Sequence, residues 1–548
     1  MLKPILLSLL SLVAYSAAAQ NPASLPPVKL TSFRADTVRI MQFGAVADGV
    51  TKNTNAIQQA LDACSQQGGG VVLVPQGQWL TGPLEMRTNV NLHVATGALL
   101  QFSNDRNDFK LIKTNWEGLS AVRNQALIYG KDLENVAITG DGILDGAGEV
   151  WQMVQKPRTT DSEWKQVVAS GGVLNEKQDR WYPSAQSLKG TTVKEAGVLT
   201  PEKQNISDFA DIKDYLRPDF LVLDHCRRVL FEGVTFQNSP AWTVHPILCQ
   251  DVVVRNVKVL NGPYTPNTDA LDLESCQNGL VEGCTFSAGD DGICIKSGRN
   301  EQGRARAVPT ENFLIRNCTV YRAHGGFVIG SEMSSGARNL YVQNCTFIGT
   351  DIGLRFKTTR GRGGIVENIF IDNVVMKDIL NEAILFDMYY MIKDPAQAPG
   401  ATERPTSEAK PVDETTPQFR HIQISNVTCQ GAKTALWVRG LPEMAIQDIS
   451  IKNAVLQSRQ GLICIEADNL HLQNVTLLPT DTNPVMEVHN SQSITLDNIK
   501  YPANAAVLLR VTGAQKSKNI KLLHTDGSKA KQEISLGNGV KKKAVTMR

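Results

Sequence analysis

The sequence lacks the features that define several large classes of protein. Its only long apolar run stands at the very start, so no later segment is long enough to span a bilayer as a helix. Neither sign of charge dominates, because the formal net charge is +2 and the isoelectric point is about 8.0. This balance excludes a strongly basic nucleic-acid-binding protein on composition alone. We therefore expect neither a nucleic-acid partner nor a membrane anchor.

What the sequence does contain favours a packed globular protein. Hydrophobic residues make up 42% and charged residues 20% of the chain, which is enough apolar material for a core and too little charge for disorder. No stretch inside the repeats described below has the 3.6-residue period of an amphipathic helix. The expected fold class is therefore all-β.

The first residues indicate export. Lys3 precedes the apolar run 5–13, and small residues follow, ending with alanines at positions 17–19. This order is typical of a secretory signal, here residues 1–19, followed by a linker at 20–35. A membrane anchor is the alternative, but the run is too short. No cysteine near the cleavage point would carry a lipid. We expect an exported protein, periplasmic or secreted, whose oligomeric state the sequence leaves open.

One short pattern recurs through most of the chain. Alternating apolar residues are followed by Asn or Gly, then by an apolar residue and often Thr. Consecutive Asn or Gly positions from 256 to 373 are 27, 34, 27 and 29 residues apart. A unit this small cannot bury a face alone, so neighbouring units must stack. Short strands stacked in this way form a parallel β-helix, whereas a propeller blade needs roughly 40–50 residues.

Stacking in register predicts where the cysteines lie. Cys284, Cys318 and Cys345 follow the Asn or Gly of their units, where later units carry Val374 and Val427. A column that accepts valine is apolar, and free cysteine behaves there as a small hydrophobic residue. Parallel side-chain directions also make poor disulfide geometry. Although exported proteins often carry disulfides, we expect these three thiols to be free and buried.

The repeats and their interruptions predict the domain organisation. A single β-helix domain is expected at 36–525, with excursions from the coil at 149–220 and 394–418 and a solvated tail at 526–548. Ahead of the repeats, Ala56, Ile57, Ala60 and Leu61 have helical spacing, with Asn53 as the expected N-cap. A helix here would cover the open end of the β-helix and its unpaired strand edges.

Chemically active side chains recur about one coil apart. Asp269 and Asp290 are separated by 21 residues, Asp290 and His324 by 34, and His324 and Arg355 by 31. Stacking would bring all four to one side of the β-helix. Hydrolysis of a glycosidic bond needs one carboxylic acid to protonate the leaving oxygen and one carboxylate to activate water or attack. With Asp291 added, adjacent carboxylates also raise one another's pKa, which can keep one of them protonated.

Two cations accompany these carboxylates. Arg355 and Lys357 are two residues apart, so on a strand they share a face. Cations beside carboxylates make sense if the substrate itself is acidic. Taken singly, each group has an ordinary explanation: an Asp pair in a turn, a capping histidine, a solvated strand. Lys296 and Asp272 are interpreted as structural. Five further arginines would widen the basic region: Arg299, Arg304, Arg306, Arg360 and Arg362.

The four groups together resemble a known family. The order Asn267-Thr268-Asp269, Asp290-Asp291, His324-Gly325 and Arg355-x-Lys357 is similar to the signature of glycoside hydrolase family 28, the polygalacturonases. The resemblance covers most of the chain from position 43 onward. It implies a right-handed parallel β-helix and hydrolysis of α-1,4-galacturonosidic bonds in polygalacturonate or pectin with inversion. It implies no metal and no cofactor. Ala323 departs from the Gly or Ser that usually precedes the histidine.

The resemblance also implies a role for each residue. Asp290 would be the general acid, and Asp269 and Asp291 would hold and activate the water. His324 would tune the acid. The remaining positions would bind the acidic polysaccharide or oligogalacturonide: Asn267, Arg355, Lys357 and Tyr390, with Tyr389 as the alternative tyrosine.

The excursion at 149–220 bears on where the polymer is cut. An insert of this size can wall off one end of the cleft, and its Trp164, Trp181 and Tyr182 are expected to stack on a terminal sugar. The alternative is that it packs elsewhere or makes an oligomer contact. The chain also resembles bacterial exo-acting members of the family, so exo cleavage is expected. Three other functions remain open: a pectate lyase, a rhamnogalacturonan hydrolase, and a non-catalytic carbohydrate-binding β-helix.

Overall fold

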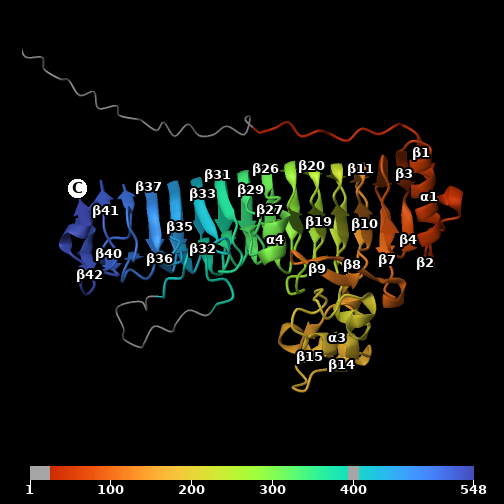
Figure 1. Ribbon diagram of the computed structural model, residues 1–548, viewed down its shortest axis with the longest axis horizontal. Coiled ribbons are helices and arrows are strands. Elements are labelled where there is room, and N and C mark those ends of the chain that lie inside the picture. Colours follow the sequence, from red (N-terminus) through yellow and green to blue (C-terminus); the bar gives the residue numbers. More distant parts are fainter. Residues whose placement is uncertain (1–24, 393–406) are drawn as a thin grey trace, which may run out of the picture.

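The computed structural model describes residues 25–392 and 407–548. The predicted signal at 1–19, part of the linker and part of the second excursion lie outside these residues. Parallel strands stack into one long column, with a helix at the N-terminal end and the C-terminus at the other (Figure 1). Within the described ranges, no helix is both long and apolar enough to cross a membrane. The predicted all-β parallel β-helix is confirmed.

The first face of the column is a fourteen-stranded parallel sheet that carries the candidate site. Its strands, from the N-terminal end, are β5 (Leu84–Glu85), β10 (Ile128–Lys131), β16 (Leu221–Asp224), β19 (Val244–Ile247), β22 (Leu271–Glu274), β25 (Asp291–Lys296), β28 (Gly325–Ile329), β30 (Leu354–Lys357), β32 (Glu382–Asp387), β34 (Thr434–Arg439), β36 (Gln460–Ile465), β38 (Met486–His489), β40 (Ala505–Thr512) and β42 (Ala530–Leu536).

Two further ladders of strands complete each coil. The second ladder begins with β1 (Thr37–Arg39), β3 (Gly70–Val74), β6 (Val90–Val94), β11 (Glu134–Thr139), β17 (Arg227–Glu232), β20 (Gln250–Arg255), β23 (Gln277–Glu282) and β26 (Thr310–Arg316). The third ladder comprises β2 (Asp48–Lys52), β4 (Gly77–Thr81), β7 (Ala98–Phe102), β12 (Ile143–Asp145), β18 (Thr235–Gln237), β21 (Lys258–Leu260), β24 (Thr285–Ser287) and β27 (Thr319–Tyr321).

Toward the C-terminus these two ladders merge into long bent strands. They are β29 (Ala337–Ile348), β31 (Ile365–Lys377), β33 (Gln418–Gln430), β35 (Ile446–Ser458) and β37 (Ala467–Pro479), followed by the short β39 (Thr495–Asp497), β41 (Ile520–Leu523) and β43 (Val545–Met547).

The recurring asparagines are where the chain bends between the second and third ladders. Asn317, Asn344 and Asn373 have φ of 57°, 53° and 53°, a left-handed conformation that asparagine tolerates better than most residues. Their side chains also bond from coil to coil: Asn344 donates to Asn317 at 3.4 Å, and Asn373 donates to Asn344 at 2.8 Å. Each repeat in the sequence therefore corresponds to one bend per coil. The coil-to-coil hydrogen bonds between these asparagines form a ladder that holds successive bends together.

The core runs along the inside of the column. Cys345 pairs in register with Val374, and Val374 with Val427, as the repeat predicts. Cys284, Cys318 and Cys345 are each 1% exposed and free, so the predicted buried thiols are confirmed. A second set of buried free thiols follows three strands of the first face: Cys226, Cys249 and Cys276.

The N-terminal helix α1 (Thr54–Gln66) covers the end of the column, as expected (Figure 1). It buries Ile57, Ala60 and Leu61 against the first coils. Asn53 stands at the N-cap position, but its side chain does not cap the helix. Instead its amide bonds to the backbone of Val46 in both directions, at 2.7 and 3.0 Å, which fixes the preceding turn.

The C-terminal segment differs from the expected solvated tail. Strand β42 pairs in parallel with β40, and β43 pairs with β41, so residues 526–548 add a further coil. The short 3₁₀ helices η7 (Gly527–Lys529) and η8 (Lys542–Ala544) flank β42. The charged composition of this coil hid it, because a terminal coil covers only one neighbour and needs fewer apolar residues.

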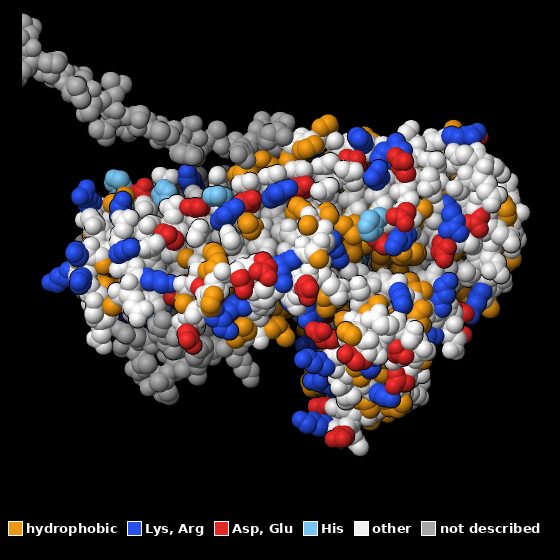
Figure 2. Space-filling model, in the orientation of Figure 1, with side chains coloured by type: hydrophobic (Ala, Val, Ile, Leu, Met, Phe, Trp, Pro, Cys, Tyr) orange, Lys and Arg blue, Asp and Glu red, His pale blue; other side chains and the backbone are white. Residues whose placement is uncertain are grey.

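The excursion at 149–220 leaves the column and projects from its side (Figures 1 and 2). It contains η4 (Gly148–Val150), β13 (Val154–Gln155), η5 (Lys156–Arg158), α2 (Asp161–Ala169), β14 (Val173–Leu174), β15 (Arg180–Tyr182), α3 (Ala185–Gly190) and η6 (Ile206–Tyr215).

An earlier hairpin joins the excursion to the column. Strands β8 (Leu111–Trp116) and β9 (Leu119–Asn124) follow η3 (Arg106–Asp108) and pair antiparallel. The excursion then pairs with β9 through Ala121 and Val198. An apolar cluster of Val122, Phe209 and Leu216 packs the two together. Hairpin and excursion therefore form one unit beside the first face.

The asparagine ladder generates a stability prediction. Asn344→Ala should destabilise the protein by about 2 kcal/mol, because alanine disfavours the left-handed conformation and cannot make the ladder bonds. Asn344→Gly should cost about half as much, since glycine accepts the conformation and loses only the bonds. Thermal melting measures both, with the adjacent Gln343→Ala as the control. Equal melting temperatures for all three variants would contradict a role for the ladder.

Candidate active site

Four neighbouring strands of the first face, β22, β25, β28 and β30, bring the predicted groups together. The Ala270 amide donates to the Asp291 carbonyl at 2.9 Å, so Asp269 lies next to Asp291. The His324 amide donates to the Asp290 carbonyl at 2.7 Å, which sets His324 beside Asp290. Arg355 pairs in register with Val328, further along the strand. In-register stacking therefore gathers the predicted groups over four coils.

These side chains open onto a cavity of about 240 Å³. It is lined by acidic residues (Glu117, Asp269, Asp290, Asp291 and Glu332), by basic residues (Lys296, Arg299, Lys357 and Arg362), and by Trp242, Asn267, Ser331, Tyr390 and Met391. All eight predicted site residues except His324 and Arg355 line it directly. Those two contact Asp290 and Asp291 at its rim.

Asp291 is the ionised carboxylate of the site. Its side chain is 1% exposed, with Lys357 Nζ at 2.7 Å and Arg355 Nη1 at 3.2 Å. Burial raises the pKa of this carboxyl, but the charges of Lys357 and Arg355 outweigh burial and hold it well below its usual range. Asp291 in turn raises the pKa of Lys357, against the effects of burial and of the Arg355 charge. Asp291 is therefore the carboxylate of the site whose environment most favours the ionised form.

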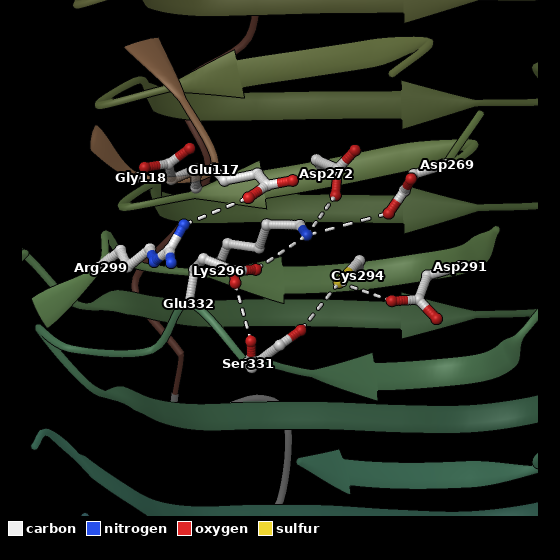
Figure 3. Close-up of polar contacts among 12 residues, drawn as sticks. Glu117, Gly118, Asp269, Asp272, Asp291, Cys294, Lys296, Arg299, Ser331 and Glu332 are labelled. Atoms are coloured by element: carbon white, nitrogen blue, oxygen red, sulfur yellow. Dashed lines mark hydrogen bonds and ion pairs between the residues drawn. The ribbon is translucent and has the colours of Figure 1, made fainter. Parts of the chain in front are cut away.

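Asp269 and Asp272 have the opposite environment. Both are buried, and they share one cation, Lys296, whose Nζ lies 3.8 Å from Asp269 and 3.6 Å from Asp272. Burial, followed by the charges of Asp272 and Asp290, raises the pKa of Asp269 well above its usual value. Burial likewise raises the pKa of Asp272 to about 7, although Lys296 opposes this. Figure 3 shows Lys296 reaching between these two carboxylates and Glu332.

Asp290 is the most accessible of the three predicted catalytic carboxylates, with 21% of its side chain exposed. His324 Nδ1 lies 3.1 Å from its Oδ1, and the other ring nitrogen of His324 lies 3.7 Å from Asp351. The hydrogen bond with Asp290 raises the pKa of His324, while burial lowers it. A protonated His324 would place a positive charge against the accessible face of Asp290.

The geometry distinguishes the two candidate tyrosines. The Tyr390 ring lies 5.0 Å from Lys357 Nζ and lines the cavity. Tyr389 instead lies between Arg360 and Arg439, at 5.4 and 4.8 Å. Tyr390 is therefore the tyrosine at the site.

Several residues at the site were not predicted to act there. Lys296 is the last residue of β25, the strand that begins at Asp291. This shared strand could have indicated that Lys296 lies at the site, but from the sequence Lys296 was interpreted as structural. Glu332 lies 3.3 Å from Lys296. Glu117 arrives from the tip of the β8–β9 hairpin and nothing in the repeat points to it. Of the five arginines expected to widen the basic region, only Arg299 and Arg362 line the cavity.

The excursion contributes to the site through different residues than expected. Trp164, Trp181 and Tyr182 are 9%, 8% and 5% exposed and line neither the catalytic cavity nor the one beside it. The Trp181 indole donates within the excursion, to the Gly171 carbonyl. These aromatic residues therefore form the core of the insert, because a projecting unit must bury its own apolar surface. The predicted stacking on a sugar is wrong for all three.

The wall beside the site is built from the hairpin tip and a later part of the excursion. Arg299 holds both, with Nη1 3.3 Å from Glu117 and Nη2 2.9 Å from Glu195. Its backbone amide also donates to the Gly118 carbonyl at 3.3 Å. Trp116, at the same tip, stacks on Trp242 with ring centroids 5.0 Å apart. The hairpin tip and the excursion thereby stand against one side of the cavity.

One group of side chains has metal-ligand spacing among the residues described: Asp269, Asp291 and Cys294, whose ligand atoms lie within 4.8 Å of one another. The donor set does not suit calcium, which takes six to eight oxygen ligands. Lysine and arginine already neutralise Asp291. The spacing suits a water molecule bound by both carboxylates.

Comparison with known proteins gives consistent matches. The family described as "Glycosyl hydrolases family 28" matches residues 203–410, and the one described as "Rhamnogalacturonase A/epimerase, pectate lyase-like" matches 37–193. A probable polygalacturonase of Vitis vinifera is 26% identical, covering 83% of this chain and 82% of its own. The exo-poly-alpha-D-galacturonosidase of Dickeya chrysanthemi is also 26% identical, covering 64% of this chain and 57% of its own.

A solved structure gives a closer match. The hyperthermoactive exopolygalacturonase of Thermotoga maritima is 32% identical to this chain, covers 82% of it and 93% of its own length, and superposes with a TM-score of 0.65. The match to family 28 covers the coils that carry all three aspartates, whereas the match to the pectate lyase-like family covers only coils that precede them. The right-handed parallel β-helix, the carboxylate cluster and these matches together show that the chain belongs to family 28 of the glycosyl hydrolases.

Proposed function

We propose that this protein hydrolyses α-1,4-galacturonosidic bonds of polygalacturonate, with inversion, from the non-reducing chain end. One observation carries the proposal: three aspartates from adjacent coils meet beside Arg355 and Lys357 in a cavity flanked by the hairpin and the excursion. The carboxylates supply the acid and base that hydrolysis needs, and the cations match an acidic sugar. The exopolygalacturonase relative from Thermotoga maritima supports the substrate and the exo mode.

In this proposal Asp290 protonates the leaving oxygen. It is the accessible carboxylate, and His324 contacts it from the solvent side. Asp269 and Asp291 bind the attacking water, because their oxygens lie within 4.8 Å of each other and can share one molecule. Asp291, which is ionised, takes the water's proton. Asp269, whose pKa is raised, donates to the water and orients it.

Substrate binding would make Asp291 a better base. In the free protein Lys357 and Arg355 lower its pKa, so its affinity for a proton is weak. The carboxylate of a bound galacturonate would share these two cations and Tyr390 would pack against the sugar. The substrate carboxylate would then neutralise part of the positive charge of Lys357 and Arg355, and the pKa of Asp291 would rise. Asp291 would therefore become an effective base only when an acidic sugar is bound and shares the two cations.

The exo mode is supported by the wall of hairpin β8–β9 and excursion segment 193–217. Arg299 joins both parts, so they stand together as a wall on this side of the cleft. An endo-acting cleft needs two open ends. A polymer can enter this one only by its terminus.

Elimination by a pectate lyase would need calcium and a basic proton acceptor close to the scissile bond. The spacing and chemistry of Asp269, Asp291 and Cys294 do not suit calcium, and both cations near Asp291 are engaged by it. A chelator should therefore leave the rate unchanged. Formation of an unsaturated product that absorbs in the ultraviolet would instead establish a lyase.

We also propose that residues 1–19 direct export, to the periplasm or beyond the cell, and that the catalytic domain begins near residue 36. Strand β1 starts at Thr37, in agreement with that boundary. The excursions at 149–220 and 394–418 would then be insertions within one catalytic domain. Immunodetection in fractionated cells tests the export.

Asp290→Asn should lower kcat by roughly 10²–10⁴-fold on polygalacturonate, since a general acid is worth about that much. Reducing-sugar release measures the rate, and an unchanged melting temperature would show that the fold is intact. Asp378→Asn is the matched control, because Asp378 is an exposed aspartate on a turn remote from the cavity. Near-normal turnover by Asp290→Asn would remove this residue from the role of acid.

Lys357→Ala should raise KM for oligogalacturonates by roughly tenfold or more, the value of a hydrogen bond between charged groups. It should also move the acidic limb of the kcat/KM profile to higher pH. The reason is that Lys357 lowers the pKa of Asp291, so without it more alkaline conditions are needed to ionise the base. Added salt should mimic the change only weakly, because Lys357 is 5% exposed. Lys258→Ala, on the exposed third face, is the control; an unshifted profile would contradict the pairing.

The exo mode predicts short products. Polygalacturonate should lose viscosity slowly while reducing ends accumulate, and chromatography should find only mono- or digalacturonate at early times. The measurement is viscosity plotted against reducing-sugar release. A steep early fall in viscosity with mid-length oligomers would mean endo cleavage and an open cleft.

A further inference from the structure

A second cavity, of about 270 Å³, adjoins the catalytic one on the side of the earlier coils. The two share Glu117, Asn267 and Arg299 at their boundary. The second cavity is otherwise formed by the hairpin, by excursion residues 193–198 and by the segment that leads back into β16. No step proposed above uses it.

Two guanidinium groups face this cavity without a carboxylate partner. Arg123 is 5% exposed; its Nε and Nη2 both donate to the Arg217 carbonyl, at 3.0 and 2.7 Å. Arg217 donates to two backbone carbonyls and, at 2.7 Å, to the amide oxygen of Asn267. Among the residues the structure describes, neither forms an ion pair. Arg299 differs, because Glu117 and Glu195 neutralise it.

Arg123 is buried and Arg217 is partly buried, and a cation withdrawn from water is unfavourable unless something compensates it. Burial lowers the pKa of Arg123 to about 9 and the charge of Arg217 acts in the same direction, whereas the charges of Asp219 and Glu117 oppose the shift. The Arg123 guanidinium lies over the Trp116 ring, with its central carbon 3.5 Å from the ring centroid. A guanidinium that lines a cavity and has no carboxylate within ion-pair distance is suited to a planar anion such as a carboxylate.

The hairpin and the excursion form the sides of the second cavity. Arg299, at the boundary with the catalytic cavity, ties the hairpin tip to the excursion, and the Ser120 amide donates to Gln302 of α4 (Asn300–Arg306) at 2.8 Å. Asn267, which accepts from Arg217, also lines the catalytic cavity. With the proposed cleavage from the non-reducing end, a sugar over the catalytic carboxylates would place its non-reducing neighbour in the second cavity.

Building on the proposed hydrolysis, we propose that this second cavity binds the carboxylate of the terminal galacturonate through Arg123 and Arg217. The chain end would be recognised by its charge, one unit beyond the sugar at the catalytic carboxylates. The released product would accordingly be digalacturonate. A neutral terminal sugar would leave the two guanidinium groups without a carboxylate within ion-pair distance, so it would bind poorly.

Hydrolysis gives the first test. Wild-type protein should release digalacturonate from polygalacturonate, and its kcat/KM should be at least about tenfold higher for trigalacturonate than for digalacturonate, because only the trimer fills the second cavity and crosses the scissile position. Arg123→Gln should reduce this ratio by about tenfold, and Arg123→Lys should restore part of it. Lys113→Gln, on the same hairpin but lining a different cavity, is the control. Release of monogalacturonate by the wild type, or an unchanged ratio, would overturn the proposal.

Binding gives a second test that does not depend on turnover. In the Asp290→Asn background, calorimetry should show trigalacturonate binding about tenfold more weakly once Arg123→Gln is added, at an unchanged melting temperature. Equal affinities would overturn the proposal. If wild-type protein cleaved no galacturonan while Arg123-dependent binding persisted, the proposed hydrolysis would fail and the binding site would stand. If the wild-type protein released only monogalacturonate, the proposed hydrolysis would stand and the proposed binding site would fail.

Discussion

Hydrogen bonding in register between successive coils is the constraint on which the rest of the structure depends. It makes each residue the neighbour of residues one coil earlier and later, so a repeat in the sequence becomes a column in space. The asparagine ladder and the thiol column are two results of this rule. The candidate site is a third, because Asp269 is brought beside Asp291 and Asp290 beside His324 by the same backbone bonds that hold the fold.

The charges at the site are arranged to give chemically identical side chains different properties. Asp291 is buried with two cations and stays ionised, whereas Asp269 and Asp272 are buried with one lysine between them and tend to keep a proton. Burial acts on all three in the same direction, so the number and distance of the cations decide the outcome. Lys296 is central to this division, since it contacts Asp269, Asp272 and Glu332.

The parts that restrict access to the site come from outside the repeat. The β8–β9 hairpin and segment 193–217 approach the first face from the side, and Arg299 of the column fastens both. The coils carry the carboxylates and the cations of the candidate site on strands, while the loops that the coils anchor form the side of the cavity.

The sequence by itself determined the all-β class, the stacking of coils, the buried thiols and the aspartate cluster, because these follow from a short period and from residues at fixed places within it. It also identified the cations Arg355 and Lys357. Only the tertiary structure placed Glu117, Trp116, Arg123 and Arg217 at the site and kept Trp164 and Trp181 away from it. Loops carry no repeat, so their packing depends on surfaces that exist only after the column has formed. The last coil was hidden for a related reason: it has one neighbour to cover, and its composition resembles a solvated tail.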